Sequence, residues 1–294
     1  MDQDLAALIA IAQRHTGSRG DIVRRLSVNM QEHQTEIGAM IYDPVVCLVL
    51  QGTKRVFIGD EVIDYGPGDY MVVGAEVAAL AQISTASPDT PYLALNLDLD
   101  PSVITDLLLN MARPPVPPMP IGYSISKAGS QLLRAWRNWA ELLEEPSDIY
   151  LEVLHREQEL LQRLLMTPQG ALLREIGAPE GRLDQIRKAM TWIRENHAKH
   201  LSVAEMARIA GMSLSVFHRR FRLVSGLSPL QYQKHIRLYE ARRRLFAENR
   251  EASSIAYAVG YESASQFSRE YKRLFGRPPR QDADLRRAEI SASG

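Results

Sequence analysis

The sequence predicts an α+β protein with two domains, an N-terminal antiparallel β-barrel or sandwich with flanking helices and a C-terminal all-helical domain. Three observations support this fold class. Short β-rich runs fill residues 23–99, a helical unit occurs twice in the last third of the chain, and the charge changes sign between the two parts. With 294 residues, the chain is long enough to bury two separate cores.

The formal net charge of zero combines two parts of opposite sign. Residues 181–294 contain 22 Lys and Arg against 11 Asp and Glu, whereas residues 1–180 contain 13 against 24. A basic domain is typical of proteins that bind polyanions, because neutralising phosphates releases their counterions. The alternative is a basic domain that docks on its acidic neighbour, and charge alone favours neither.

The first residues favour a cytoplasmic protein. An acidic, amphipathic helix is expected over residues 3–15, without the basic start and cleavage site of a signal peptide. No run of about 18 apolar residues occurs, so we expect no membrane partner. The single cysteine, Cys47, excludes an intramolecular disulfide framework and a thiolate metal cluster.

Residues 23–99 alternate between apolar and polar or run apolar in short segments, which is typical of an antiparallel barrel or sandwich. The turns IGDE and GPGD separate some of them and predict tight connections. The segments are LSVNM, EIGAMIY, PVVCLVLQG, KRVFIGD, EVIDYGPGDYMVV, AALAQIST and YLALNLDL. We therefore expect the barrel over about residues 20–100.

Helical patterns follow up to residue 176, which ends the first domain (1–176). They cover 102–112, 127–144, 148–166 and 168–176, with a break at PPVPPMP (114–120). The leucines of helix 148–166 either pack on the barrel or pair with a second subunit. These are Leu151, Leu154, Leu161, Leu164 and Leu165. Gly, Pro and the change of charge sign then mark a linker at GAPEGR (177–182).

The last third contains a duplicated unit. Within VAEMARIAGMSLSVFHRRFRLVSGLSP (Val203–Pro229), the part from Glu205 onward aligns with SIAYAVGYESASQFSREYKRLFGRPP (Ser254–Pro279), and the second copy has one extra residue after Gly260. The matched positions carry the same residue types in both copies, including Ala, Gly, Phe, Arg and Pro. Such agreement at chemically specific positions indicates an internal repeat.

Each copy has the pattern of a helix-turn-helix. Ser202 with Glu205 predicts a capping box, Gly211 a left-handed turn, and Ser213 the cap of a second helix over 214–225. Phe217, Phe221 and Val224 form its apolar face. The second copy repeats this with a short helix 253–259, a break at Gly260 and a helix 264–275. The first unit thus spans about 202–225 and the second about 252–275.

The opposite faces of the two second helices carry residue types that bind DNA. Arg binds guanine edges, Gln pairs with adenine, and Ser and His bind bases or phosphates. A solvated charged face is the alternative for one such helix, but two basic copies in the same alignment favour DNA. The candidates are Ser215, His218, Arg219, Arg222, Ala264, Ser265, Gln266, Ser268, Arg269, Lys272 and Arg273.

A long helix is expected between the copies, over Pro229–Ala247 with Ser228 as cap. Its 18 or so residues span roughly 27 Å, which suits two helices placed in successive major grooves about 34 Å apart. A further helix over 182–197 packs on the first unit through Ile186, Met190 and Ile193.

Residues 182–280, which close with GRPP (Gly276–Pro279), resemble the AraC/XylS transcription regulators. The resemblance implies a sequence-specific DNA-binding domain over 183–283, RNA polymerase as a partner and a homodimer. It also implies base contacts from Ser215, His218, Arg219, Ala264, Ser265, Ser268 and Arg269. Relatives often carry Trp where this chain has Ser215, so a different site preference is expected there.

The segment YDPVVCLVLQGTKRVFIGDEVIDYGPGDYMVV is similar to the sensor domain of the AraC branch that includes regulators of aldehyde reductase genes. That resemblance covers roughly residues 15–175 and implies a cupin-like barrel. Enzymatic cupins bind metal through a His-x-His pair, whereas His33 is the only histidine between residues 16 and 154. We therefore expect no metal, no cofactor and no catalysis.

A barrel interior can instead hold a small effector. The alternation suggests Met40, Tyr42, Val46, Leu48, Phe57 and Tyr70 as lining residues, although plain core packing is the alternative for each. Cys47 is either a small buried side chain or a thiol that senses electrophiles or oxidants. The pattern does not decide whether Cys47 or its neighbours face the interior.

The sequence thus predicts an effector-responsive transcriptional regulator, inserting helices 214–225 and 264–275 into two successive major grooves of double-stranded DNA. We expect it in the cytoplasm, associated with the nucleoid when bound to DNA. Two alternatives remain. The first is a constitutive DNA-binding protein whose N-terminal domain senses nothing, and the second is a cupin enzyme with a nucleic-acid-binding tail.

Overall fold

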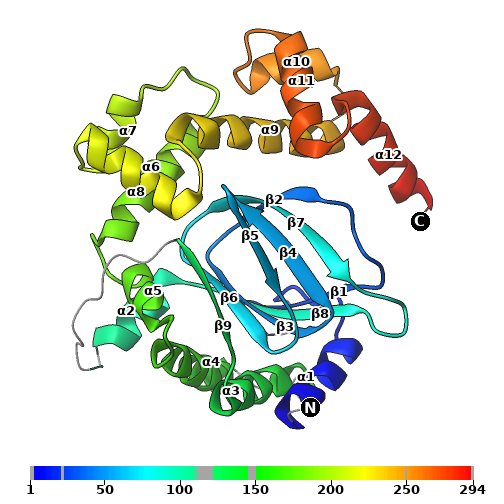
Figure 1. The fold of residues 1–294 in the computed structure, drawn as a ribbon, viewed down its shortest axis with the longest axis vertical. Coiled ribbons are helices and arrows are strands. Elements are labelled where there is room, and N and C mark those ends of the chain that lie inside the picture. The colour runs from blue at the N-terminus through cyan, green and yellow to red at the C-terminus, as the bar shows by residue number, and fades with distance from the viewer. Residues whose placement is uncertain are drawn as a thin grey trace. The chain divides into compact units, whose positions relative to one another are not determined.

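The computed structural model describes residues 3–20, 23–109, 111, 122–144, 150–248 and 250–292. The chain divides into two compact units, Met1–Asp184 and Gln185–Gly294 (Figure 1). The division falls just after the expected linker 177–182. Within the described residues, no helix is long and apolar enough to cross a membrane.

The first unit is a sandwich of two antiparallel sheets, which confirms the predicted fold class. Five strands form one sheet in the order β1-β8-β3-β6-β9, and four form the other in the order β2-β7-β4-β5. The strands are β1 (Leu26–Gln31), β2 (Gly38–Tyr42), β3 (Val45–Gln51), β4 (Thr53–Ile58), β5 (Glu61–Tyr65), β6 (Asp69–Val73), β7 (Val77–Thr85), β8 (Tyr92–Asp98) and β9 (Tyr123–Lys127).

Alternation along the strands sorts the side chains between two layers. Val45, Cys47 and Val49 of β3 belong to the apolar core between the sheets, together with Val56 and Ile58 of β4. The intervening β3 side chains, such as Val46 and Leu48, are equally buried but lie on the opposite face, where helix α1 contacts β3 and β8. The five-stranded sheet is therefore covered on both faces.

The helices of this unit pack with one another and with the sandwich. Helix α1 contacts α3, α3 contacts α4, and α5 contacts α2 and α4. Trp136 and Trp139 of α3 are fully buried. The bounds are α1 (Gln3–Arg14), α2 (Pro101–Leu109), α3 (Ser130–Ala140), a 3-10 turn η1 (Glu141–Leu143), α4 (Tyr150–Leu165) and α5 (Gly170–Ile176).

Strand β9 corrects one expectation. A helix was expected over 127–144, but Tyr123–Lys127 pairs with Asp69–Val73 of β6 and forms the edge of the five-stranded sheet. The helix begins only at Ser130. The segment YSISK alternates as an edge strand does, but a short run beside a proline-rich break gave too weak a pattern. The break at 114–120 lies outside the described residues.

The leucines of α4 pack within their own chain. Leu161, Leu164 and Leu165 are buried, as is Leu160, whereas Leu151 at the start of the helix is 68% exposed. Of the two alternatives for this helix, intramolecular packing accounts for three of the five predicted leucines.

The second unit is built around one long helix, α9 (Figure 1). Helices α7 and α8 lie at one end of it and α10 and α11 at the other, and all four contact it. Aromatic rings packed edge to face lie in both cores, with Phe221 against Tyr232 in the first and Phe267 against Tyr271 in the second. The bounds are α6 (Arg182–Glu195), α7 (Val203–Ile209), α8 (Leu214–Ser225), α9 (Pro229–Ala247), α10 (Ala252–Ala258), α11 (Ala264–Phe275) and α12 (Pro279–Ala292).

Helix capping follows the sequence in part, because the capping box expected for Ser202 and Glu205 has only one of its two hydrogen bonds among the described residues. The hydroxyl of Ser202 accepts a hydrogen bond from the Glu205 amide, and Ser228 forms a full capping box with Gln231. Ser213 occupies the N-cap position of α8, but its side chain makes no capping hydrogen bond to any described residue, so the expected cap is wrong there. Ser263 caps the equivalent helix α11 by accepting from the Gln266 amide.

Candidate nucleic-acid interface and ligand pocket

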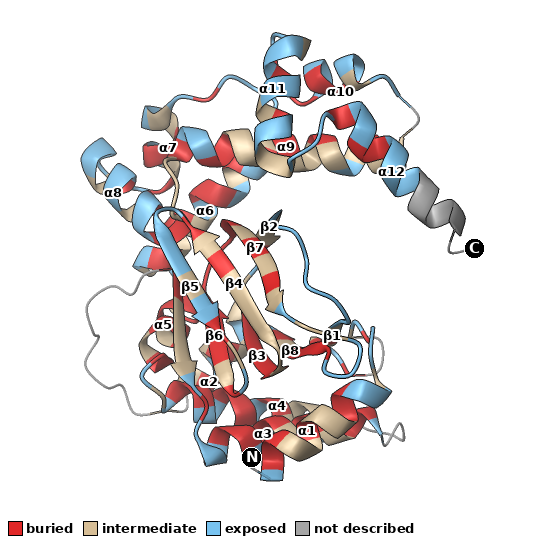
Figure 2. Ribbon diagram, turned by 45° about the vertical axis from the view of Figure 1, so that its right-hand side comes forward, coloured by how far each residue is buried: buried red, intermediate tan, exposed pale blue. Residues whose placement is uncertain are grey.

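Helices α8 and α11 present the predicted DNA-binding residues to solvent (Figure 2). Buried Phe217 and Phe221 anchor α8, and buried Phe267 and Tyr271 anchor α11. The outward face is exposed at all predicted positions except Ala264, which is half-buried. The exposed residues are Ser215, His218, Arg219, Arg222, Ser265, Gln266, Ser268, Arg269, Lys272 and Arg273.

Several of these cations have no acidic partner. Arg219, Arg269 and Lys272 form no ion pair within the part of the chain that the structure describes. The neutral side chain of Gln266, in contrast, has an acidic partner, because its amide donates a hydrogen bond to Glu270 Oε1 at 3.3 Å. Two exposed arginines that no carboxylate neutralises are therefore displayed, one on each copy, as contacts to phosphates or guanine would require.

Glu270 holds α11 against its surroundings. Its Oε1 accepts from Lys234 Nζ of α9 at 3.0 Å, and its Oε2 accepts from the Tyr261 hydroxyl at 2.9 Å. Burial tends to raise the pKa of Glu270, but the hydrogen bonds from Lys234, Gln266 and Tyr261 outweigh it and lower the pKa. The ionised carboxylate thus links the recognition helix of the second copy to the connecting helix.

A second buried link joins α11 to α12 and α9. The Tyr271 hydroxyl donates to Asp282 Oδ2 at 2.7 Å, and Arg242 Nε donates to the same oxygen at 2.9 Å. Asp282 is buried on α12, a helix that was not expected from the sequence. The carboxylate is satisfied by a hydroxyl and a cation, as a buried charge requires.

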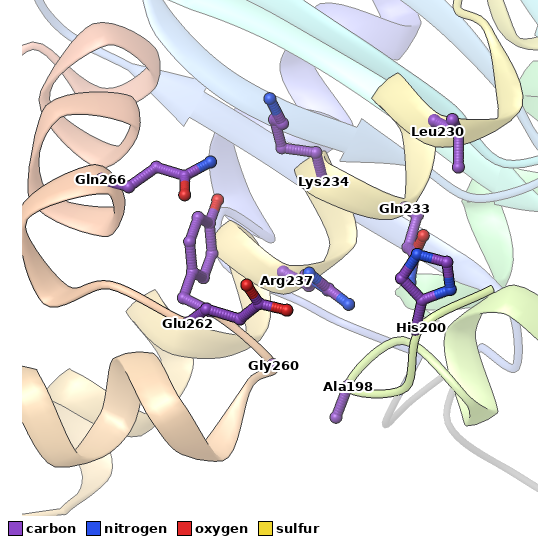
Figure 3. A pocket seen from close by; sticks show the side chains of 10 residues that line it. Ala198, His200, Leu230, Gln233, Lys234, Arg237, Gly260, Glu262 and Gln266 are labelled. Atoms are coloured by element: carbon purple, nitrogen blue, oxygen red, sulfur yellow. The ribbon is translucent and has the colours of Figure 1, made fainter.

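The connecting helix also holds the loop before α7. Gln233 Nε2 and Arg237 donate to the carbonyl oxygens of His197 and Lys199 at 2.7–2.9 Å. These side chains line a cavity of about 510 Å³ together with Ala198, His200 and Gly260 (Figure 3). Helix α9 thus holds the α6–α7 loop through Gln233 and Arg237 and holds α11 through Lys234.

The sandwich contains a second cavity, of about 280 Å³, that opens between the two sheets. Three of the residues suggested from the sequence line it: Met40, Tyr42 and Cys47. The other lining residues are Asn29, Ile41, Asp43, Val45, Lys54, Tyr92, Ala94, Asn96 and Asp98.

The other four suggested residues do not line this cavity, which corrects that expectation. Val46, Leu48 and Tyr70 are fully buried but point to the opposite face of the five-stranded sheet from Cys47 and Met71. Phe57 alternates with the inward Val56 and Ile58 of β4 and is half-buried on the other face. A run such as VVCLVL is apolar at every position and has no apolar–polar alternation, so the pattern does not show which residues face inward.

Lys54 is the cationic residue among the lining residues that were not expected from the sequence. In TKRVFI the apolar Val56 and Ile58 face inward, so the same alternation places Lys54 inward and Arg55 outward. The signal was therefore present in the printed sequence. The Lys54 ammonium lies 5.0 Å from the centre of the Tyr42 ring, an attractive cation–π arrangement.

The groups around Lys54 are neutral at neutral pH. Burial raises the pKa of Tyr42 and of the Cys47 thiol, and it raises the pKa of Tyr65 and Tyr92 well above their ordinary value. Burial lowers the pKa of Lys54, whereas its interactions with Tyr42 and Cys47 raise it, and the net shift is upward. Lys54 is therefore a protonated cation.

Some polar atoms at this cavity have no partner. The hydroxyl of Tyr42 and the Oδ1 of Asn96 are buried and form no hydrogen bond with any described residue. No group of three or more His, Cys, Asp and Glu side chains that could hold a metal ion occurs in the described residues. The polar groups that line the cavity are thus hydroxyl, amide, thiol and ammonium groups together with the carboxylates of Asp43 and Asp98.

Two family models match the chain. The model of the AraC-type transcriptional regulator N-terminus matches residues 22–172, and a helix-turn-helix model matches residues 206–284. Among curated relatives, the transcriptional activator RhaS of Enterobacter sp. (strain 638) is 26% identical over 171 residues, 58% of this chain and 60% of the relative. RhaS of Yersinia pestis (strain Pestoides F) is 29% identical over 140 residues, 48% of this chain and 49% of the relative. The chain thus spans about half to three-fifths of these relatives.

Solved structures share the fold over most of the chain. ToxT from Vibrio cholerae strain SCE256, solved with a bound unsaturated fatty acid, has a TM-score of 0.59 at 10% identity and covers 88% of this chain and 94% of its own. ToxT from Vibrio cholerae O395 bound to (E)-4-(8-methylnaphthalen-1-yl)but-3-enoic acid has a TM-score of 0.54 at 10% identity, covering 89% and 98%. These likenesses concern the fold.

Proposed function

The chain belongs to the AraC-type transcriptional regulators, and from this premise we propose that it binds specific double-stranded DNA through α8 and α11 and responds to a small effector held between the sheets. One matching model describes the N-terminal part of a transcriptional regulator, and the other describes a helix-turn-helix domain. As a regulator, the protein works in the cytoplasm, where it has access to promoter DNA and RNA polymerase.

The observation that carries the proposal is the pairing of two equivalent helices with unneutralised cations. Arg219 on α8 and Arg269 on α11 occupy matched positions of the repeat, are exposed and have no ion pair within the described residues. Nineteen residues of α9 separate the two helix-turn-helix copies, a rise of about 28 Å that suits successive major grooves.

The effector would act by shifting a population. A ligand that binds one arrangement of the protein more tightly raises the fraction of that arrangement, and with it the affinity for DNA or for the polymerase. The fatty acid in ToxT supports a ligand site in a protein of this fold. The relatives named as the transcriptional activator RhaS support activation of transcription. The homodimer remains an expectation from the family resemblance.

Fluorescence anisotropy tests the DNA-binding proposal. The probe is the region upstream of the gene and its neighbours, the comparison is a scrambled duplex, and the titrations are repeated over a series of salt concentrations. We expect tighter binding to the native duplex and an affinity that falls steeply with salt. Equal binding to both duplexes at every salt concentration would contradict sequence-specific recognition.

Matched arginine variants locate the contact. Arg219→Ala and Arg269→Ala are each expected to weaken specific binding by about tenfold or more, since a guanine or phosphate contact is lost. Arg243→Ala is the control, because Arg243 is also exposed in the second unit but lies on α9 and pairs with Glu240. It should change the affinity less than about twofold. Equal losses in all three variants would assign the effect to overall charge.

A further inference from the structure

Gln266 is the longest uncharged polar side chain on the exposed face of α11. It lies three residues before Arg269, so the two side chains neighbour each other on the helix surface, away from buried Phe267 and Tyr271. A glutamine in the major groove reads a base through two atoms, because its amide has an acceptor oxygen and a donor nitrogen. Which base it selects depends on which of these atoms faces the DNA.

Glu270, one turn further along α11, determines how the Gln266 amide is turned. Gln266 Nε2 donates to Glu270 Oε1 at 3.3 Å. An ionised carboxylate only accepts hydrogen bonds, so the amide nitrogen faces it and a flipped amide would bring two oxygens together. The lowered pKa of Glu270 keeps the carboxylate ionised at neutral pH. Gln266 Oε1 accepts no hydrogen bond from any residue that the structure describes, and it is free for a base.

Glu270 is itself held in place. Its Oε1 accepts from Lys234 Nζ at 3.0 Å and its Oε2 accepts from the Tyr261 hydroxyl at 2.9 Å, and its side chain is 16% exposed. Lys234 and Gln266 line the same cavity (Figure 3). The ammonium also neutralises a carboxylate that would otherwise repel phosphates. The acceptor beside Gln266 is therefore fixed before any DNA binds, which lowers the cost of ordering the amide.

The edges of the bases match this arrangement unequally. Adenine presents the N6 donor and the N7 acceptor in the major groove, whereas guanine presents two acceptors and thymine one. An amide held with its oxygen outward accepts from adenine N6, and the second hydrogen of Nε2 donates to adenine N7. Cytosine N4 offers one contact, and guanine would place O6 against the amide oxygen. A freely rotating amide would instead flip and donate to guanine or thymine.

The first copy lacks this pair of side chains. At the same positions of the repeat, α8 carries Val216 in place of Gln266 and Arg220 in place of Glu270. An apolar side chain and a cation provide neither the amide nor its acceptor. The arrangement is thus specific to α11, and its effect should be confined to the part of the DNA site that the second copy contacts.

We propose that Glu270 is a positioning residue for DNA recognition, which holds the Gln266 amide with its oxygen outward so that α11 selects adenine at one base pair. This inference rests on the proposed function, for which it names a determinant of sequence specificity. Without the Glu270 carboxylate the amide rotates freely, and the selection at that base pair is lost while the rest of the site is still recognised.

Selection from a random duplex library, with the full chain and with Gln266→Ala, locates the base pair. We expect Gln266→Ala to lose the preference at one position, which is A·T in the wild-type site. Fluorescence anisotropy then compares duplexes that differ only there. The wild type should prefer adenine by about fivefold or more. Replacing that adenine by purine, which lacks the 6-amino group, should weaken wild-type binding several-fold.

Variants of Glu270 test its role. Glu270→Gln should reduce the adenine preference to less than about twofold, because a glutamine both donates and accepts and so permits either orientation of the Gln266 amide. Glu270→Asp keeps the charge but withdraws the oxygens from Gln266, so it should also reduce the preference and gives the decision if Glu270→Gln does not fold. Glu262→Gln is the matched control, since it removes the same charge from an exposed residue before α11 that has no hydrogen bond to Gln266 in the described structure. It should keep the preference.

Three results would overturn the proposal: Gln266→Ala leaves the preference at every position unchanged, the affected base pair is G·C, or both Glu270 variants keep the adenine preference. A purely structural role of Glu270 would weaken binding to all duplexes alike and leave the preference intact. Failure of the proposed function gives a different result. A wild-type protein that selects no common sequence would reject specific recognition altogether, whereas a selected sequence that does not depend on Glu270 would reject this inference alone.

Discussion

A methyl group on Gly260 would lie 2.3 Å from the carbonyl oxygen of Ala198 and 2.8 Å from its carbonyl carbon. The turn between α10 and α11 therefore packs directly on the loop after α6. Gly260 also has a φ of +93°, in the left-handed region that favours glycine. Its counterpart in the first copy, Gly211, has a φ of +63° but open space, the nearest atom to an added Cβ being Gln185 Nε2 at 3.9 Å.

This contrast predicts different costs for the same substitution. Gly211→Ala should lower the free energy of unfolding of the compact unit Gln185–Gly294 by about 1 kcal/mol, the cost of placing an alanine in the left-handed conformation. Gly260→Ala should lower it by about 3 kcal/mol, because backbone atoms of Ala198 must also move. Urea unfolding of both variants measures the difference. Equal losses would show that φ alone decides and that the contact with Ala198 is relaxed at little cost.

The helix-turn-helix units were predictable because local signals determine them. Glycine at the helix ends, serine at Ser202 and Ser228, and aromatic residues at helical spacing each act within a few residues of the chain. The duplication then supplied the same pattern twice. Ser213 is the exception, because a serine side chain at an N-cap position can adopt another rotamer in which its hydroxyl binds solvent and not the backbone amide.

The ligand cavity was harder to predict because it depends on which face of each strand is inward. Strand β3 is covered on both faces, so VVCLVL is apolar throughout and its pattern does not show which side chains face the core between the sheets. Val46 and Leu48 were therefore suggested beside Cys47. β4 alternates clearly because one face is more exposed, and there Lys54 could have been found. β9 and the Asp282 contact depend on pairings between segments distant in the sequence, which no local pattern contains.

Cys47 should be an unreactive thiol in the native protein. It is 4% exposed, and burial raises its pKa, so the nucleophilic thiolate is scarce at neutral pH. Iodoacetamide at pH 7 should label Cys47 much more slowly in the folded chain than in urea, as measured by mass spectrometry. Labelling at similar rates in both conditions would contradict this and favour a thiol that senses electrophiles.

His235 makes the stability of the second unit depend on pH. Burial, followed by the positive charges of Arg273 and Lys234, lowers its pKa from 6.5 to about 4. Between these values the unfolded chain takes up a proton that the folded chain does not, so the stabilisation is complete above pH 6.5 and declines as the pH falls towards 4. At pH 5 the loss is about 2 kcal/mol.

Urea unfolding of the wild type and His235→Leu at pH 7 and pH 5 isolates this group, because all other titrations are common to both. The stability difference between them should shift by about 2 kcal/mol in favour of the variant at pH 5. A difference that stays constant would mean that His235 is protonated in the folded state as readily as in the unfolded chain.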